Sequence, residues 1–212
     1  MGTHMLLGVI DCGEWRVAQN FTSFEKEPED SGTRLISILK NCSTDIYNNL
    51  YHCKFIATDE EDIPESIEEY PTLSSLMGID ILTEIAYCEK YDSIPLIDSR
   101  SFFQDECECE YAFIIDYDTN KLTCYICGNR FVFGEYDLKE LPETNTFVYD
   151  FKKTQLANID EIVEIRCRTL VSLFHRMGDD SGSDVDVVIN SIRKSLLNQC
   201  MLDEPIDNES TD

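Results

Sequence analysis

The sequence predicts an α+β protein with a mainly antiparallel sheet, helices packed on one face, and a helical pair at the C-terminus. Alternating apolar and polar residues near the N-terminus and in the middle of the chain predict β-hairpins. Apolar residues at helical spacing lie between these hairpins and again in the last quarter of the chain. Hydrophobic residues make up 42% of the 212 residues, which is enough for one sizeable core.

The chain is expected to contain a single domain over residues 5–200. Residues 1–4 resemble an expression-vector remnant, and the acidic tail at residues 201–212 is expected to be disordered. The domain opens with a predicted hairpin, in which Leu6–Ile10 and Trp15–Gln19 are strands. Trp15, the only tryptophan, is expected to anchor this hairpin.

The segment after the first hairpin is predicted to be helical. Thr44 and Asp80 are the expected caps of its second and third helices. Residues 91–104 are expected to form a loop. The predicted helices are Thr33–Asn41, Thr44 to about Phe55, and Asp80–Glu89.

Alternation with a period of two residues then predicts three antiparallel strands with a turn at Tyr117–Asn120. The last third is predicted to be helical again. A capping-box spacing at Asn158–Glu161 starts one helix, and Asp184 is expected to cap the next. The three strands are Cys109–Asp116, Lys121–Cys127 and Arg130–Tyr136.

The charge of the chain limits its possible partners. Forty-two acids against 17 Lys and Arg give a net charge of −25. Nucleic acid and anionic membranes are disfavoured as partners because both would repel the chain, whereas a basic protein would be attracted. The charge is concentrated over Phe55–Asn120, which holds 18 acids and two cations, a net charge of −16.

Acidic runs within this region are the candidate binding residues. The acidic stretch, Asp59–Tyr70, has seven carboxylates in twelve residues and no cation. If the later run Asp105–Glu110 is strand, Glu106, Glu108 and Glu110 project from one side of it. The alternative is that these runs are solvated loops that aid solubility. The candidate partner-binding residues are Asp59, Glu60, Glu61, Asp62, Glu65, Glu68, Glu69, Asp105, Glu106, Glu108 and Glu110.

The cysteines suggest a zinc site only weakly. If Thr119-Asn120 is a two-residue turn, Cys124 pairs with Ile115, and the pairs Cys107/Cys109 and Cys124/Cys127 lie at different heights of the sheet. The double CxxC spacing of a zinc ribbon is also missing. We therefore expect no metal and no cofactor, and most of the ten cysteines to be reduced core residues.

Other signals of chemistry are equally weak. Asp179–Asp186 lacks the spacing of an EF-hand and is expected to be a helix linker. His52 and His175 lie on predicted helices without an evident nucleophile, and no phosphate-loop, dinucleotide or HExxH motif occurs. No apolar run reaches the length of a membrane helix and no signal peptide opens the chain, so a cytoplasmic protein is expected.

Two segments resemble a largely uncharacterised family found in fungi, bacteria and phages. Residues 8–41 are similar to the family's strand ending in V-A-Q, its loop W-D-G-Y-P-E-G-x-G and its following helix. Residues 109–128 are similar to its E-Y-A-Y-V-I-D-L-D hairpin, and the two segments cover about a quarter of the chain. In the loop, only Pro28, Glu29 and Gly32 match. The resemblance implies an α+β fold and no particular activity.

A small, strongly acidic chain of this composition also resembles the immunity proteins that neutralise basic nuclease toxins, including those of yeast killer plasmids. This resemblance implies a non-enzymatic binding protein whose carboxylates mimic phosphates on the surface of a basic toxin. The alternative is a hydrolytic or metal-assisted enzyme that uses acids near the first hairpin. A pocket lined by convergent carboxylates would distinguish the enzyme from the binding protein.

Overall fold

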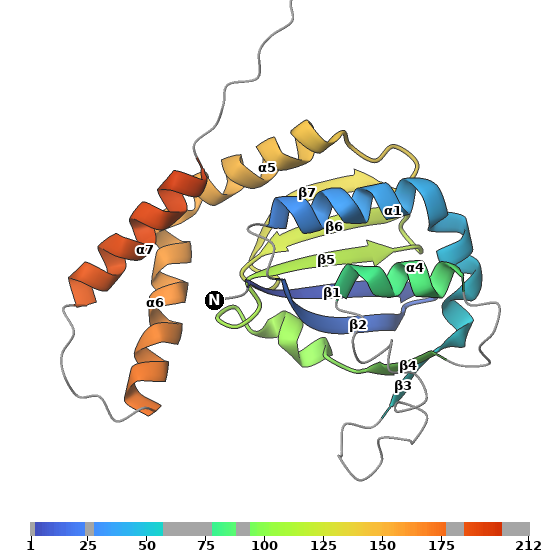
Figure 1. Cartoon of the computed structure of the whole chain (residues 1–212), viewed down its shortest axis with the longest axis horizontal. Coiled ribbons are helices and arrows are strands. Elements are labelled where there is room, and N and C mark those ends of the chain that lie inside the picture. Colours follow the sequence, from blue (N-terminus) through green and yellow to red (C-terminus); the bar gives the residue numbers. More distant parts are fainter. Residues whose placement is uncertain (1–2, 24–27, 57–77, 88–93, 177–184, 201–212) are drawn as a thin grey trace, which may run out of the picture.

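The computed structural model describes residues 3–23, 28–56, 78–87, 94–176 and 185–200, and it has the predicted α+β architecture (Figure 1). The main sheet consists of β1 (Thr3–Asp11), β2 (Glu14–Ser23), β5 (Tyr111–Asp116), β6 (Lys121–Ile126) and β7 (Phe131–Asp137). The α-helices in the described residues are α1 (Pro28–Asn49), α4 (Ile81–Ala86), α5 (Thr144–Ala157), α6 (Ile159–Arg176) and α7 (Val185–Gln199).

The strands of the main sheet lie in the order β2-β1-β5-β6-β7. Helices α1, α4 and α5 cover one face of this sheet, and α6 and α7 form a helical pair beyond the end at which β1 starts (Figure 1). Three of the four strand pairs are antiparallel, while β1 and β5 pair in parallel at the centre. The predicted fold class, including the C-terminal helical pair, is confirmed.

The first hairpin forms as predicted and is longer than expected. Cys12 and Gly13 have φ angles of +55° and +72°, which are the positive values that a two-residue type I′ turn requires. Strand β1 begins at Thr3, so it includes two of the four residues that resemble a vector remnant.

The central meander also forms, but its register differs from the one used to assess the cysteines. Asp116 pairs with Lys121, so the β5–β6 turn has four residues rather than two. The Asp116 Oδ1 atom accepts the N–H groups of Asp118 at 2.9 Å and Thr119 at 3.1 Å, and Asn120 has φ +58°. These backbone contacts fix the longer turn and move Cys124 opposite Phe113 instead of Ile115.

The two predicted N-terminal helices are one continuous helix, α1, and Thr44 lies inside it. No glycine or proline interrupts Thr33–Asn49, so nothing stops the first helix at Asn41. The segment predicted as the end of the second helix is instead the strand β3 (Cys53–Ile56). It pairs in parallel with β4 (Ile94–Ile97), which lies in the segment expected to be a loop.

Two further differences concern helices. Asp80 stands at the N-cap of α4 as predicted, but its side chain makes no cap hydrogen bond. It forms an ion pair with Arg34 of α1, with 2.5 Å between Nη2 and Oδ1. Helix α5 lies in the last third of the chain, which is predicted to be helical, but the sequence assigns it no bounds; only Phe147, Phe151 and Gln155 are buried along its 14 residues.

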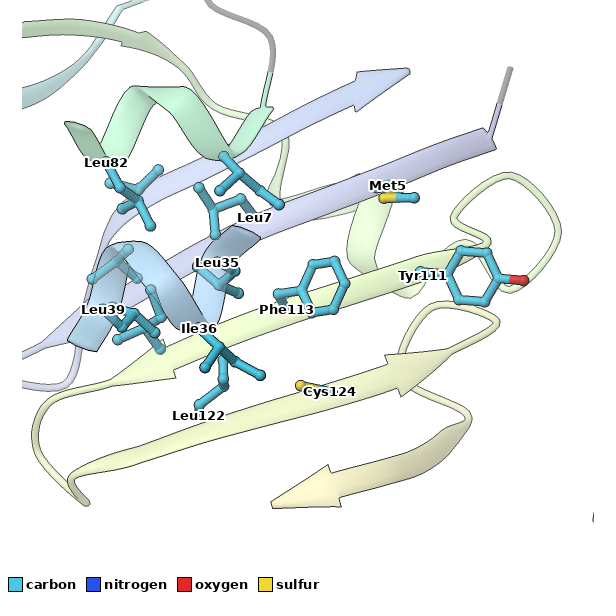
Figure 2. Close-up of a cluster of buried hydrophobic side chains, with 14 of the residues drawn as sticks. Met5, Leu7, Leu35, Ile36, Leu39, Leu82, Tyr111, Phe113, Leu122 and Cys124 are labelled. Carbon is cyan, nitrogen blue, oxygen red and sulfur yellow. The ribbon is translucent and has the colours of Figure 1, made fainter. Parts of the chain in front are cut away.

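The main hydrophobic core lies between the sheet and the three covering helices (Figure 2). Met5 and Leu7 of β1 and Phe113 of β5 point toward the helices, and each is fully buried. Leu35 and Leu39 of α1 fill the space above them, close to Leu82 of α4 (Figure 2).

The opposite face of the sheet has a thinner cover. Leu6, Ala112 and Ile114 are buried there under aromatic side chains rather than under an α-helix. Phe103 contacts the rings of Trp15 at 5.9 Å and Tyr125 at 5.2 Å between centroids. Phe103 belongs to the 3₁₀-helix η3 (Arg100–Gln104). Its contact with Trp15 anchors the first hairpin to η3, as expected for Trp15.

The contact between α1 and α5 leads to a stability prediction. In an ordinary helix, replacing Gly with Ala stabilises by about 1 kcal/mol. A Cβ atom on Gly32 would overlap the buried ring of Phe147, and such overpacking costs about 1–3 kcal/mol. We therefore expect Gly32→Ala to lower the free energy of unfolding, as measured by urea denaturation.

Ser37→Ala, at an exposed position of the same helix, is the control and is expected to have little effect or to stabilise slightly. In a double-mutant cycle, Phe147→Leu should recover part of the loss caused by Gly32→Ala. Purely additive effects would show that the two side chains do not compete for this space.

Candidate functional site

The eleven predicted partner-binding residues divide into two groups. The seven acids of the acidic stretch lie outside the described residues. The other four belong to the segment Asp105–Glu110, here called the acidic turn, which connects η3 to β5. The structure therefore tests the geometry of the acidic turn alone.

The acidic turn is not a strand, so the condition under which Glu106, Glu108 and Glu110 would project from one side is not met. Strand β5 begins only at Tyr111. The Asp105 Oδ1 atom accepts the N–H groups of Cys107 and Glu108, each at 2.9 Å, and so caps the turn. These two bonds stabilise a bend at the point where the alternating Glu-Cys sequence predicted extended backbone.

Two arginines contact the acidic turn from outside the acidic region, Phe55–Asn120. Arg130, between β6 and β7, lies with its Nη1 atom 3.9 Å from Glu106, and its Nη2 atom is 2.5 Å from Glu161 of α6. Arg166 of α6 reaches Glu110 at 3.1 Å. Glu108 is exposed and has no ion pair among the described residues. The turn is therefore partly neutralised by the chain itself.

The Arg166–Glu110 pair is the more enclosed of the two contacts. Both side chains are 24% exposed. Arg166 also donates to the Tyr111 hydroxyl at 3.0 Å, and burial raises the pKa of Tyr111 to about 12. The Glu110 Oε1 atom accepts the His4 N–H at 3.2 Å, which ties the turn to β1. Glu110 thus holds together α6, β1 and the start of β5.

The flanks of residues 57–77, which include the acidic stretch, join the described structure near this turn. On one side, Ile56 pairs with Ile97, and η3 then spans roughly 10 Å toward Asp105. On the other side, Gly78 lies against the ring of Phe21.

Phe21 and Tyr111 both pair with Met5 from opposite sides, so they lie about 10 Å apart. The anchoring points of the two acidic runs therefore lie near the same end of the sheet. This spacing fits within one protein–protein interface, which has about 800 Å² per partner and a width of roughly 30 Å.

A second acidic group lies at the opposite end of the sheet. Within the part of the chain that the structure describes, only one group of three potential metal ligands is close enough to share an ion. It consists of Asp11, Cys12 and Asp118. Both Asp118 oxygens already accept turn N–H groups, from Cys12 at 2.8 Å and Gly13 at 2.6 Å. The negative charge of Asp11 raises the pKa of the Cys12 thiol.

The observed register brings Cys109 and Cys127 to the same end of the sheet, contrary to the prediction. The Cys127 N–H donates to the Glu110 carbonyl at 2.8 Å, and the Gly128 N–H donates to the Cys109 carbonyl at 2.6 Å. Burial raises the pKa of Cys109 to about 12 and that of Cys127 to about 11. Burial therefore keeps both thiols protonated at neutral pH, as expected for core cysteines.

The residues considered for catalysis have structural contacts or lie outside the described side chains. His52 belongs to the 3₁₀-helix η1 (Leu50–His52), and its ring stacks on Tyr51 with 3.9 Å between centroids. Of the residues shared with the family loop, Glu29 pairs with Lys152 at 3.5 Å and Gly32 lies under Phe147. These contacts hold α1 against α5.

The side chain of His175 and the segment Asp179–Asp184 are outside the described residues. No helix in the described part of the chain is long and apolar enough to cross a membrane. Comparison with family models, with curated proteins and with solved structures found no match in any of the three.

Sequence reasoning did not find Arg130, Glu161 or Arg166. These residues lie at least ten positions beyond Phe55–Asn120, so the local charge of that region does not reveal them. One signal was available for Arg166, because it lies on the apolar side of α6 beside Ile162 and Ile165, which are buried. A charged residue in such a position usually has a partner.

The raised pKa values of the buried thiols predict a pH dependence of stability. Cys109 and Cys127 keep their protons in the folded state up to about pH 11, whereas unfolded thiols lose them near pH 8.5. The folded state therefore binds more protons in this window, and the free energy of unfolding should fall as the pH rises through it.

Urea denaturation at about pH 8 and about pH 10 tests this dependence. The variant Cys109→Ala/Cys127→Ala should lose less stability between the two pH values than the wild type does. Equal losses would mean that the two thiols do not cause the dependence. Cys12→Ala, at an exposed position, is the matched control.

Proposed function

We propose that the protein binds a basic protein stoichiometrically and acts as an immunity or antitoxin protein against a basic toxin such as a ribonuclease. In this mechanism, its carboxylates take the place of nucleic-acid phosphates on the surface of the toxin and exclude the substrate. The observation that carries the proposal is the set of seven acids in the acidic stretch, whose sequence contains no cation and whose flanking residues lie near the acidic turn.

Electrostatics supports binding by this mechanism. A field of one sign raises the association rate of an oppositely charged partner by roughly 10 to 10³. The region Phe55–Asn120 carries a net charge of −16, whereas Asp150–Cys200 has eight acids and seven cations. A basic partner would therefore be attracted more strongly to the elements formed by Phe55–Asn120 than to the C-terminal helices.

The structural chemistry favours a binding protein over an enzyme. In the Asp11–Cys12–Asp118 group, both Asp118 oxygens are used to hold a turn, and the ring of His52 packs against Tyr51. Cys12, Cys42, Cys109, Cys124, Cys127 and Cys167 are free thiols, which supports action in a reducing compartment such as the cytoplasm.

The test is the capture of the partner from the source cells with tagged protein, followed by measurement of the association rate at low and high salt. We expect one basic protein at a 1:1 ratio, and slower association as salt rises. Neutralising the seven acids to Asn or Gln should slow association by about tenfold or more. The test variant changes Asp59, Glu60, Glu61, Asp62, Glu65, Glu68 and Glu69.

A matched variant removes the same charge from seven exposed acids elsewhere, and it should associate nearly as fast as the wild type. Equal slowing in both variants would show that net charge alone is responsible. A captured partner that still cleaves its nucleic acid at saturating protein would refute inhibition. The matched variant changes Glu14, Asp30, Asp45, Glu140, Glu143, Asp160 and Glu164.

A further inference from the structure

Helix α6 is tied to the acidic turn by two arginines. Arg166 of α6 pairs with Glu110 at 3.1 Å. Arg130 bridges Glu106 of the turn and Glu161 of α6, with N–O distances of 3.9 and 2.5 Å. Arg166 thus links the acidic turn to α6 directly, and Arg130 links them by pairing with one glutamate of each.

A third contact lies between these two ion pairs. The Cys107 thiol donates to the Ile165 carbonyl at 3.9 Å, one residue before Arg166. Ile162 and Ile165 anchor the same helix in the main core. Helix α6 extends away from the sheet with α7 (Figure 1). Its contacts with the acidic turn and with Arg130 come from its first half, Glu161 to Arg166.

We propose that Arg130 and helix α6 form an autoinhibitory contact on the acidic turn. Their guanidinium groups occupy the carboxylates of Glu106 and Glu110, which a basic partner would otherwise bind. A partner that takes these carboxylates displaces Arg130 and Arg166 and loosens α6. This inference rests on the proposed function, because it concerns regulation of the same acidic surface.

The coupling is reciprocal. If partner binding weakens the docking of α6, then weakening that docking must raise the affinity for the partner by the same factor. The side chains of the Arg130 pairs are between 36% and 49% exposed, and exposed pairs of this kind are weak, whereas both side chains of the Arg166–Glu110 pair are only 24% exposed. A partner with several arginines can therefore compete with them, and Arg130, the more exposed of the two arginines, would yield first.

Arg130→Gln tests the competition. The probe is a fluorescein-labelled nona-arginine peptide, titrated by fluorescence anisotropy at low salt. Removing one exposed ion pair is expected to tighten binding by roughly two- to fivefold. Arg168→Gln is the matched control, because it also removes one positive charge. Arg168 lies on α6 and, among the described residues, pairs only with Glu164. The control should tighten binding by less than Arg130→Gln.

Hydrogen exchange provides a second measurement. It reports the local opening of α6, which a change in net charge elsewhere in the protein would not alter. Bound nona-arginine should speed amide exchange in residues 159–168 of the wild type. Without the peptide, Glu110→Gln should speed exchange in the same residues, while Glu164→Gln should not. Unchanged or slower exchange of this segment with the peptide bound would overturn the inference.

The outcomes separate this inference from the proposed function. Wild type, Arg130→Gln and Arg168→Gln binding with equal affinity would overturn the autoinhibitory contact and leave the acidic binding protein intact. Binding by Arg130→Gln but not by the wild type or Arg168→Gln would support the contact strongly. Binding by none of the three at low salt would overturn both.

Discussion

The parallel pairing of β1 with β5 is the constraint on which the rest of the structure depends. These two strands lie at the centre of the sheet and join the N-terminal hairpin to the later meander. Parallel neighbours cannot be joined by a tight turn, so the chain between Ser23 and Tyr111 must cross back over the sheet. That crossover includes α1, α4, β3, β4 and the acidic stretch.

The same pairing places the acidic turn. Because β5 starts beside the beginning of β1, the residue before it, Glu110, lies next to His4 and exchanges hydrogen bonds with it. The position of Glu110 is therefore fixed by its hydrogen bonds to the His4 backbone, independently of any cation. Arg166 adds one charge-assisted contact to a carboxylate that is already positioned, so little side-chain entropy is lost in forming the pair.

Local pattern was enough to predict the hairpins, α6 and α7, because each depends on residues close in sequence. It was insufficient where tertiary contacts decided. Thr44 resembles a helix cap, but Ile46 is fully buried against the core and the helix continues through it. Helix α5 has only three buried residues, too few for a clear period. The β5–β6 register followed from one aspartate that bonds two turn amides.

The acidic residues were found from the sequence, but their compensation was not, because a charge count follows the chain and a field follows space. Arg130 and Arg166 come from outside the −16 region, yet both lie on the acidic turn. Near the turn, the field of the acidic region is therefore weaker than its sequence implies. In the proposed function, attraction of a basic partner then depends mainly on Glu108 and on the acidic stretch. At the turn itself, Glu106 and Glu110 are already paired with Arg130 and Arg166 of the same chain, so a basic partner of the proposed kind would have to compete with these two arginines.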